Sequence, residues 1–230
     1  MNISVLGLPQ SGKSTFLKSL LNISETETLP DICTLKVKDD RLEEIGKLLG
    51  HNKLTYPEIS FNELDILTLN NKSAELKGIE SIQKSYGILL VIKCFDIENT
   101  SQISIDIDEI ITELIVSDAI IIENVIERRQ KSTKGKTKQE IDSVKIELEL
   151  LNSLKKHLDN GAALNSFEFK TGDIRKLTGY NLITLKPIFV LLNSDTEMIE
   201  ISNDPEINKI ANKFIYPSKL EMELSELSDS

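Results

Sequence analysis

The stretch "GLPQSGKST", residues 7–15, follows the apolar run "NISVL" at 2–6 and decides the fold class. Its glycines, lysine and serine have the spacing G-x-x-x-x-G-K-S, which is typical of a phosphate-binding loop. The segment "KSTFLKSLLN" at 13–22 then carries apolar residues at helical spacing. A strand, a glycine-rich loop and a helix in this order form the structural context that such a loop requires.

The loop predicts a nucleotide-binding site, because backbone N–H groups of the loop and of the helix N-terminus converge on phosphate oxygens. We expect Lys13, on a surface loop, to contact the β- and γ-phosphates, and the Ser14 hydroxyl to ligate Mg²⁺. The alternative is an ordinary strand–turn–helix with a chance lysine. The predicted nucleotide-binding residues of the loop are Gly7, Pro9, Gln10, Ser11, Gly12, Lys13, Ser14 and Thr15.

Further strands are indicated along the chain. The runs "GILLVIKCFD" at 87–96 and "LKPIFVLLNS" at 185–194 are continuous and apolar, as expected of strands buried on both faces. "YPEISFNELDILTL" predicts a strand ending near Asp65, "NKFIYPSKLE" a last short strand, and "DDRLEEIGKLLG" a helix ending at Gly50. The alternation predicts an α/β fold with a doubly wound, mainly parallel sheet that binds ligands at the carboxyl ends of its strands.

Residues 106–160 have no strand signal and instead show two helical patterns, which predict an inserted antiparallel helical hairpin. We therefore divide the chain into a nucleotide-binding domain, residues 1–105 and 161–230, and a helical arm, residues 106–160. The segment "RRQKSTKGKTK" at 128–138 has six basic residues and no acidic one. This basic tip is either a solvated turn or a contact surface for a protein or RNA partner.

The composition limits the function classes. The chain has 230 residues, 40% of them hydrophobic, and a net charge of −10, so that as a whole it repels nucleic acid. Two cysteines in apolar surroundings give no disulfide framework. No apolar run approaches the roughly 20 residues that span a bilayer, and no signal peptide is recognisable. We expect a cytoplasmic protein that does not bind membranes.

Several segments together resemble a known family. "GLPQSGKSTF", "ICT", "DDRLEEIGKLL", "ILLVIKCFD", "DIDEIITELIVSDAIIIE", "LITLKPIFVLLN" and "YPSKLEMELSEL" occur in the order of the Obg-like ATPases, the YchF subfamily of translation-factor-type P-loop NTPases. The resemblance implies a G domain with an inserted coiled-coil arm, followed by a TGS domain that would begin where this sequence ends. It leaves open whether the chain naturally lacks that domain or has been cut.

The resemblance also implies functional residues outside the loop. Thr34 of "ICT" matches a threonine that reaches Mg²⁺, and Asp65 matches the aspartate that positions Mg²⁺ through water. Asn193 matches the asparagine of the base-recognition motif, and Ser218 and Lys219 match the family's C-terminal "SAK" motif. The implied cofactors are Mg²⁺ and ATP or GTP, and a purine nucleotide is the implied ligand. The basic tip at 128–138 is the predicted contact for the ribosome or RNA, or for a protein.

Departures from the family pattern weaken the predicted chemistry. In the D-x-x-G motif, Thr68 replaces the glycine whose N–H meets the γ-phosphate, and the following loop is shortened. Leu69 stands where many GTPases have a glutamine that orients water. The stretch Asn193–Thr196 lacks the carboxylate at the position that reads guanine.

These departures predict a switch protein without strong guanine preference and with slow or impaired ATP or GTP hydrolysis. The alternative is a non-hydrolysing interaction module that uses its helical arm to hold a protein or RNA partner. Whether the chain is an enzyme stays open at this point.

Overall fold

The computed structural model describes residues 1–50, 53–64, 75–96, 100–131, 138–195, 205–208 and 210–228. The chain forms two compact units, which we call the sheet unit (Met1–Ser104 with Phe189–Ser230) and the helical unit (Ile105–Ile188). The helical unit begins one residue before the predicted arm. It also takes in residues 161–188, which the sequence analysis had assigned to the nucleotide-binding domain.

The described strands form one sheet in the order β2-β3-β1-β4-β5-β6. Strand β1 pairs in parallel with β3 and β4, β5 pairs in parallel with β6, and only β2 pairs antiparallel, with β3, among the pairings assigned to described strands. This arrangement confirms the predicted α/β fold with a mainly parallel sheet. The strand bounds are β1 Asn2–Leu6, β2 Cys33–Lys36, β3 Glu58–Glu63, β4 Gly87–Cys94, β5 Ile188–Ser194 and β6 Lys213–Tyr216.

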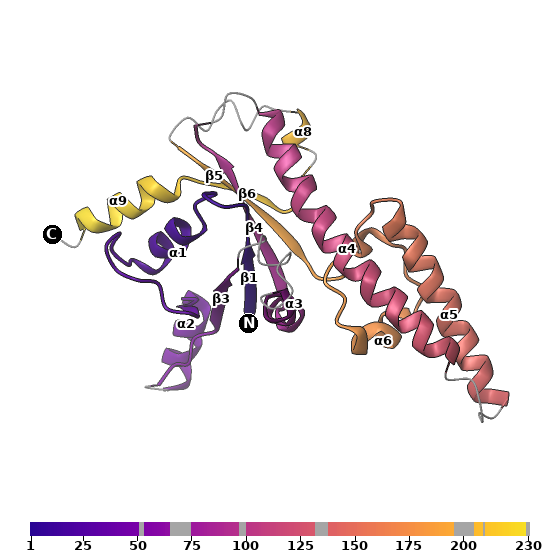
Figure 1. Cartoon of the computed structure of the whole chain (residues 1–230). Coiled ribbons are helices and arrows are strands. Elements are labelled where there is room, and N and C mark those ends of the chain that lie inside the picture. The colour runs from indigo at the N-terminus through magenta and orange to yellow at the C-terminus, as the bar shows by residue number, and fades with distance from the viewer. Residues whose placement is uncertain are drawn as a thin grey trace. The chain divides into compact units, whose positions relative to one another are not determined.

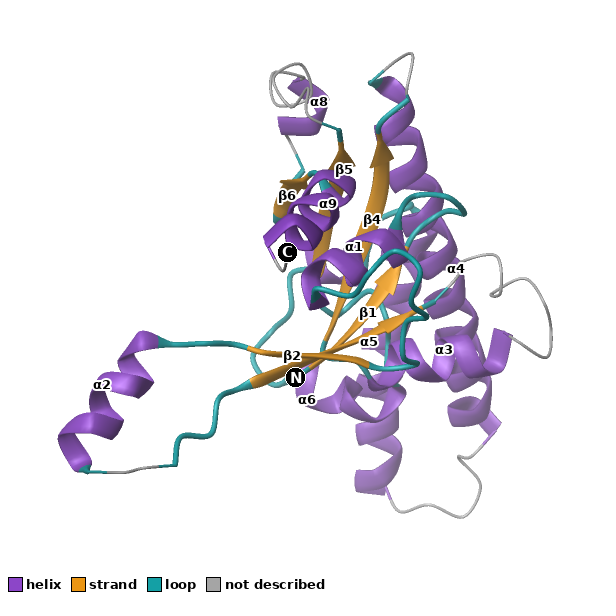
Figure 2. Ribbon diagram, turned by 90° about the vertical axis from the view of Figure 1, so that its left-hand side faces the viewer, coloured by secondary structure: helices purple, strands orange, loops and turns teal. Residues whose placement is uncertain are grey.

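Helices lie on both sides of this sheet. Figure 1 shows α1 and α3 on opposite sides of the strands, and α9 packs against α1. Residues 37–39, which are in neither helix nor strand, join β2 to α2 (Figure 2). The helices of the sheet unit are α1 Lys13–Leu21, α2 Asp40–Leu49, α3 Glu75–Lys84, α8 Pro205–Asn208 and α9 Ser218–Ser228.

The core beneath α1 explains why the loop before this helix is fixed in place. Phe16 and Leu17 of α1 are buried against Ile3 and Val5 of β1. Phe16 also meets Phe61 of β3 edge-on, with ring centroids 6.5 Å apart. Burial of two large side chains of this kind contributes roughly 3–6 kcal/mol, so the N-terminus of α1 is held at the carboxyl end of β1.

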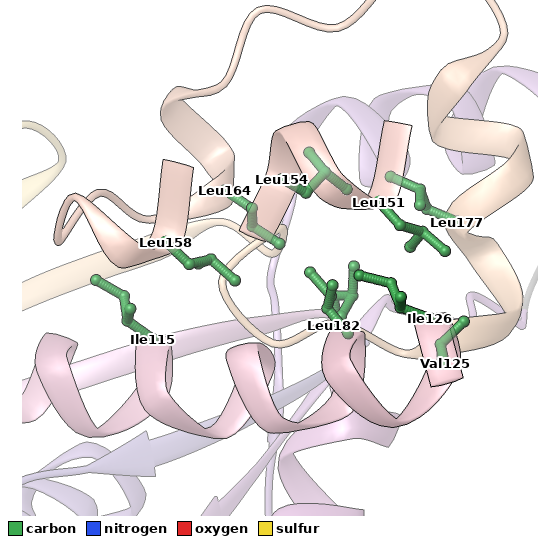
Figure 3. Packing of buried hydrophobic residues seen from close by; sticks show 10 residues of the cluster. Ile115, Val125, Ile126, Leu151, Leu154, Leu158, Leu164, Leu177 and Leu182 are labelled. Atoms are coloured by element: carbon green, nitrogen blue, oxygen red, sulfur yellow. The ribbon is translucent and has the colours of Figure 1, made fainter. Parts of the chain in front are cut away.

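The helical unit is built on α4 (Ser101–Lys131) and α5 (Lys138–Asp159), which run antiparallel. Figure 3 shows Ile115 of α4 opposite Leu158 of α5, and Val125 and Ile126 nearer to Leu151. The ion pairs Lys155–Glu123 and Arg129–Glu147 follow the same antiparallel order. The unit is completed by the short helices η2 Leu164–Ser166, α6 Asp173–Leu177 and η3 Thr178–Tyr180. Among the described helices, none combines the length and the apolar character that crossing a membrane requires.

A buried carboxylate explains why residues after 160 belong to the helical unit. Asp118 of α4 is fully buried and accepts hydrogen bonds from the backbone N–H groups of Ile183 and Thr184, both at 2.7 Å. The Thr184 hydroxyl donates a third bond at 2.6 Å. Burial raises the pKa of the Asp118 carboxyl, although the three donated bonds oppose this effect. The returning chain is thereby tied to α4.

Candidate functional site

The phosphate-binding loop predicted from the sequence lies between β1 and α1 and forms one side of a pocket of about 440 Å³. Gly7 and Ser11 belong to the loop but are not among the residues that line this pocket. Asn193, at the end of β5, donates a hydrogen bond to the backbone of the loop. The pocket is lined by Pro9, Gln10, Gly12, Lys13, Ser14, Thr15, Glu63 and Phe95.

Both glycines of the motif are required by their surroundings. A Cβ atom on Gly7 would lie 2.5 Å from the carbonyl oxygen of Val91 in β4. Gly12 has a φ of 88°, and a Cβ atom there would lie 2.1 Å from Nδ2 of Asn193. No side chain fits at either distance, and the backbone at Gly12 favours glycine in any case.

Gln10 also has a left-handed backbone, with a φ of 63°. Glutamine adopts this conformation rarely, and such outliers concentrate at ligand-binding loops because the surrounding structure enforces them. Gln10 is one of the residues that line the pocket.

Lys13 differs from its expectation as a surface residue, because its relative exposure is only 5%. Its Nζ donates hydrogen bonds to the carbonyl oxygens of Gly7 and Leu8, both at 3.1 Å. The ammonium group therefore lies inside the curve of the loop. A buried lysine needs such polar partners, and the loop supplies them.

Asn193, at the end of β5, ties together two distant segments. Its Nδ2 donates to the carbonyl oxygen of Ser11 at 2.9 Å, and its Oδ1 accepts from the N–H of Ser218 at 3.2 Å. Both partners and Asn193 itself are buried. The structure therefore gives Asn193 a positioning function, and direct contact with a base stays a prediction.

Ser218 begins α9, and its hydroxyl has no hydrogen-bond partner among the described residues, although it is fully buried. The hydroxyl of Ser11 is also buried and has no hydrogen-bond partner among the described residues. Polar atoms of this kind are uncommon in folded proteins and often mark the place of a ligand or water. Lys219, the next predicted residue, is exposed at the start of α9.

Glu63 is a residue of the pocket that the sequence analysis missed. The hydroxyl of Ser14 donates to its Oε1 at 2.7 Å. The position of Glu63 could have been predicted from the alternation of side chains along β3. Phe61 packs against α1, and residues two apart on a strand share a face. Glu63 must therefore point toward the N-terminus of α1.

The remaining predicted metal residues are Thr34 and Asp65. Thr34 is exposed in β2, where its hydroxyl lies 3.3 Å from that of Ser60, and it does not line the pocket. Asp65, Thr68 and Leu69, together with Thr196 of the base motif, lie outside the described residues. Roles for Thr34 and Asp65 at the metal stay predictions.

The electrostatics of the site include a neighbouring thiol. Burial, and secondly the Glu63 carboxylate, raise the pKa of the Cys33 thiol above its ordinary value. Within the described ranges, histidines, cysteines and carboxylates form no group of three suited to a metal ion.

A second pocket lies in the helical unit, and its lining includes the first two residues of the predicted basic tip. It encloses about 380 Å³ and is lined by Val125, Arg128, Arg129, Gly179 and Tyr180. Arg129 is paired with Glu147 at 3.1 Å and donates to the Tyr180 hydroxyl at 3.2 Å, whereas Arg128 is exposed. Residues 132–137 of the tip lie outside the described residues.

The chain is similar in sequence to known proteins over most of its length. The chain is 26% identical to "Ribosome-binding ATPase YchF" of Pasteurella multocida over 98% of its own length and 67% of that protein. It is 27% identical to "Obg-like ATPase 1" of Oryza sativa over 84% of its length and 52% of that protein. The chain thus spans about half to two thirds of these relatives. No protein-family model matches it.

The fold has a solved counterpart as well. The YchF GTPase of Schizosaccharomyces pombe superposes with a TM-score of 0.79 over 98% of this chain and 68% of that one, at 17% sequence identity. At this identity the likeness concerns the fold alone. Together with the sequence relatives it confirms the resemblance seen in the motifs: the chain is a YchF-like P-loop NTPase.

Proposed function

We propose that the chain is a nucleotide-binding switch protein that holds ATP or GTP together with Mg²⁺ and hydrolyses the nucleotide slowly or not at all. The observation that best supports this proposal is the shape of the loop. Gly7 and Gly12 allow its close approach to β4 and Asn193, and Lys13 places a positive charge inside its curve. Loops of this shape hold phosphate oxygens with their N–H groups.

The pocket is chemically suited to a hard cation. Its lining includes a carboxylate and a hydroxyl whose oxygens are 2.7 Å apart, on Glu63 and Ser14. Mg²⁺ prefers oxygen ligands of this kind together with phosphate oxygens and water. When bound, the ion would neutralise negative charge on the phosphates, while Lys13 and the loop backbone orient them.

The proposal is tested by removing the charge of Lys13. We expect Lys13→Ala to weaken Mg-nucleotide binding by at least about tenfold, because charge-assisted hydrogen bonds contribute about 1.5–3 kcal/mol each. Isothermal titration calorimetry with Mg-ATP and with Mg-GTP measures this loss. Thermal melting is needed beside it, since Lys13 also holds the carbonyl oxygens of Gly7 and Leu8.

Lys18→Ala is the matched control. Lys18 lies in the same helix, but its Nζ donates to the carbonyl oxygen of Glu25 at 2.6 Å, and it does not line the pocket. The control removes one positive charge and should leave affinity unchanged. Equal affinities of wild type and Lys13→Ala would mean that the loop is a purely structural turn.

The same titrations address the base, since the relatives' names include both an ATPase and a GTPase. We expect no strong preference for GTP, because a guanine-reading carboxylate is missing from Asn193–Thr196. For turnover, we expect single-turnover phosphate release far slower than about one per second. A rate above that value contradicts impaired hydrolysis.

A second function, contact of the helical unit with a partner, is favoured by the pocket beside Arg128. An exposed guanidinium next to a tyrosine is suited to an anionic and aromatic ligand such as RNA. Relatives named ribosome-binding make ribosomal RNA the first candidate. A cytoplasmic location agrees with such a partner and remains a prediction.

Co-sedimentation with ribosomes at low and at moderate salt tests this contact. We expect Arg128→Glu to reduce co-sedimentation more than Lys145→Glu, a charge reversal on the exposed side of α5. Unchanged sedimentation of Arg128→Glu would leave the nucleotide-binding function as the proposal and remove this one.

A further inference from the structure

Glu63 is the acidic side chain in the lining of the loop pocket, and its position follows from the sheet. It pairs with Val5 of β1 in parallel register and is the last residue of β3. Because strand residues alternate between faces, Glu63 shares the face of Phe61, which packs against α1. The carboxylate consequently reaches the hydroxyl of Ser14 in the first turn of α1, at 2.7 Å.

The charges of the pocket pose a problem for phosphate binding. Among the described residues that line it, one side chain is positive, Lys13, and one is negative, Glu63. The charges of these two side chains cancel, so the described lining side chains alone give no net attraction for a triphosphate. A carboxylate close to phosphate oxygens repels them unless a cation lies between the two groups.

A divalent cation resolves this conflict. Carboxylate, hydroxyl and phosphate oxygens are all ligands that Mg²⁺ prefers, and Glu63 and Ser14 already present two of them side by side. We infer that Glu63 is a metal-ligating residue of this pocket and makes nucleotide binding depend on Mg²⁺. The inference rests on the proposed nucleotide-binding function, and it assigns to Glu63 a part that the family resemblance gives to Asp65.

Glu63 thus has two opposite effects on a nucleotide. Without metal, its negative charge weakens binding, and with Mg²⁺, it contributes a ligand that strengthens binding. Replacement by glutamine removes both effects while keeping the shape of the side chain and an oxygen that accepts from Ser14. The ratio of metal-free to Mg-bound dissociation constants is therefore the quantity that reports on Glu63.

The experiment measures binding of a fluorescent ADP analogue and a fluorescent GDP analogue, each in excess EDTA and in excess Mg²⁺. We expect Mg²⁺ to tighten binding to the wild type strongly. In Glu63→Gln, metal-free binding should become tighter, Mg-bound binding weaker, and the ratio smaller by about tenfold or more, which corresponds to at least about 1.4 kcal/mol of lost coupling.

Glu58→Gln is the matched control, since Glu58 lies at the other end of β3 and is exposed. It should keep the ratio of the wild type. Asp65→Asn is measured in parallel to show whether the residue implied by the family carries the metal instead. Melting temperatures confirm that the variants fold.

The outcomes are distinct. A reduced ratio in Glu63→Gln together with an unchanged ratio in Glu58→Gln supports the inference. A wild-type ratio in Glu63→Gln overturns it, while nucleotide binding itself, and with it the proposed function, still stands. If the wild type binds neither analogue with or without Mg²⁺, the proposed function fails, and the inference fails with it.

Discussion

Asn193 offers the sharpest single test of how the nucleotide loop is held. In Asn193→Ala the carbonyl oxygen of Ser11 and the N–H of Ser218 both lose their buried partner. An unsatisfied buried polar group costs about 1–3 kcal/mol. Two such groups cost about 2–4 kcal/mol once some relaxation toward the pocket is allowed, a large part of a typical stability of about 5–15 kcal/mol.

Asn193→Asp separates the two ends of the side chain. One carboxylate oxygen can still accept from Ser218, but the other replaces the donor that faces the carbonyl oxygen of Ser11. Two acceptors then oppose each other in a buried place, and a negative charge is added behind the phosphate loop. We expect a destabilisation similar to that of Asn193→Ala and weaker nucleotide binding, by about tenfold or more.

Urea unfolding followed by circular dichroism and tyrosine fluorescence measures the effect. Tyr216 reports on the sheet unit, since its ring centroid lies 5.5 Å from that of Phe16. With a urea m-value of about 2 kcal/mol/M, the middle of the usual range, the expected loss lowers the transition midpoint by about 1–2 M.

Asn152→Ala is the control, because among the described residues that exposed amide donates only to the carbonyl oxygen of Leu148 in its own helix. Its midpoint should stay near that of the wild type. An Asn193→Ala midpoint equally close to the wild type would show that the two bonds do not support the loop, and the positioning function of Asn193 would have to be given up.

Two further predictions concern buried groups. Asp118→Asn should destabilise the helical unit by about 2–4 kcal/mol, since an amide cannot accept from both backbone N–H groups that face it. The control Asp108→Asn, on the exposed side of α4, should cost less than about 0.5 kcal/mol. Urea unfolding compares the two variants, and equal midpoints would contradict a stabilising effect of the buried bonds. Cys33 should react slowly with iodoacetamide near pH 8, because its raised pKa leaves little thiolate. Glu63→Gln should speed the reaction by lowering that pKa. Mass spectrometry of the labelled residue measures the rate, and an unchanged rate would show that the Glu63 charge does not affect the pKa of the thiol.

Much of the sheet was predictable from the sequence. Strands β4 and β5 contain continuous apolar runs, which are typical of buried parallel strands, and β1 carries Ile3, Val5 and Leu6. Strand β2 was missed, because it is four residues long, lies at the edge, and places only Cys33 in the core. Helix α3 was also missed, since its composition is polar and it contains Gly78, although Ile82 is fully buried.

The site was predictable to a different degree. The loop residues follow from a spacing that backbone geometry enforces at Gly7 and Gly12. The burial of Lys13 was not predictable, because its partners are two backbone carbonyl groups that any sequence would supply. Glu63 could have been found from strand alternation, but the family motif directed attention to Asp65, two residues later on the same predicted face.

Each unit contains a buried polar side chain that bonds to distant backbone groups, a feature that sequence patterns do not reveal. Asn193 and Asp118 are buried polar side chains whose partners lie far away in the sequence and include backbone groups. Backbone partners leave no trace in residue identity, so neither contact could be derived from the chain alone. Conservative replacements are costly at such positions, because an amide and a carboxylate differ in the donors they offer to fixed backbone groups. The shape of the nucleotide loop therefore depends on the end of β5 and on the first N–H of α9 as directly as on the glycines of the motif itself.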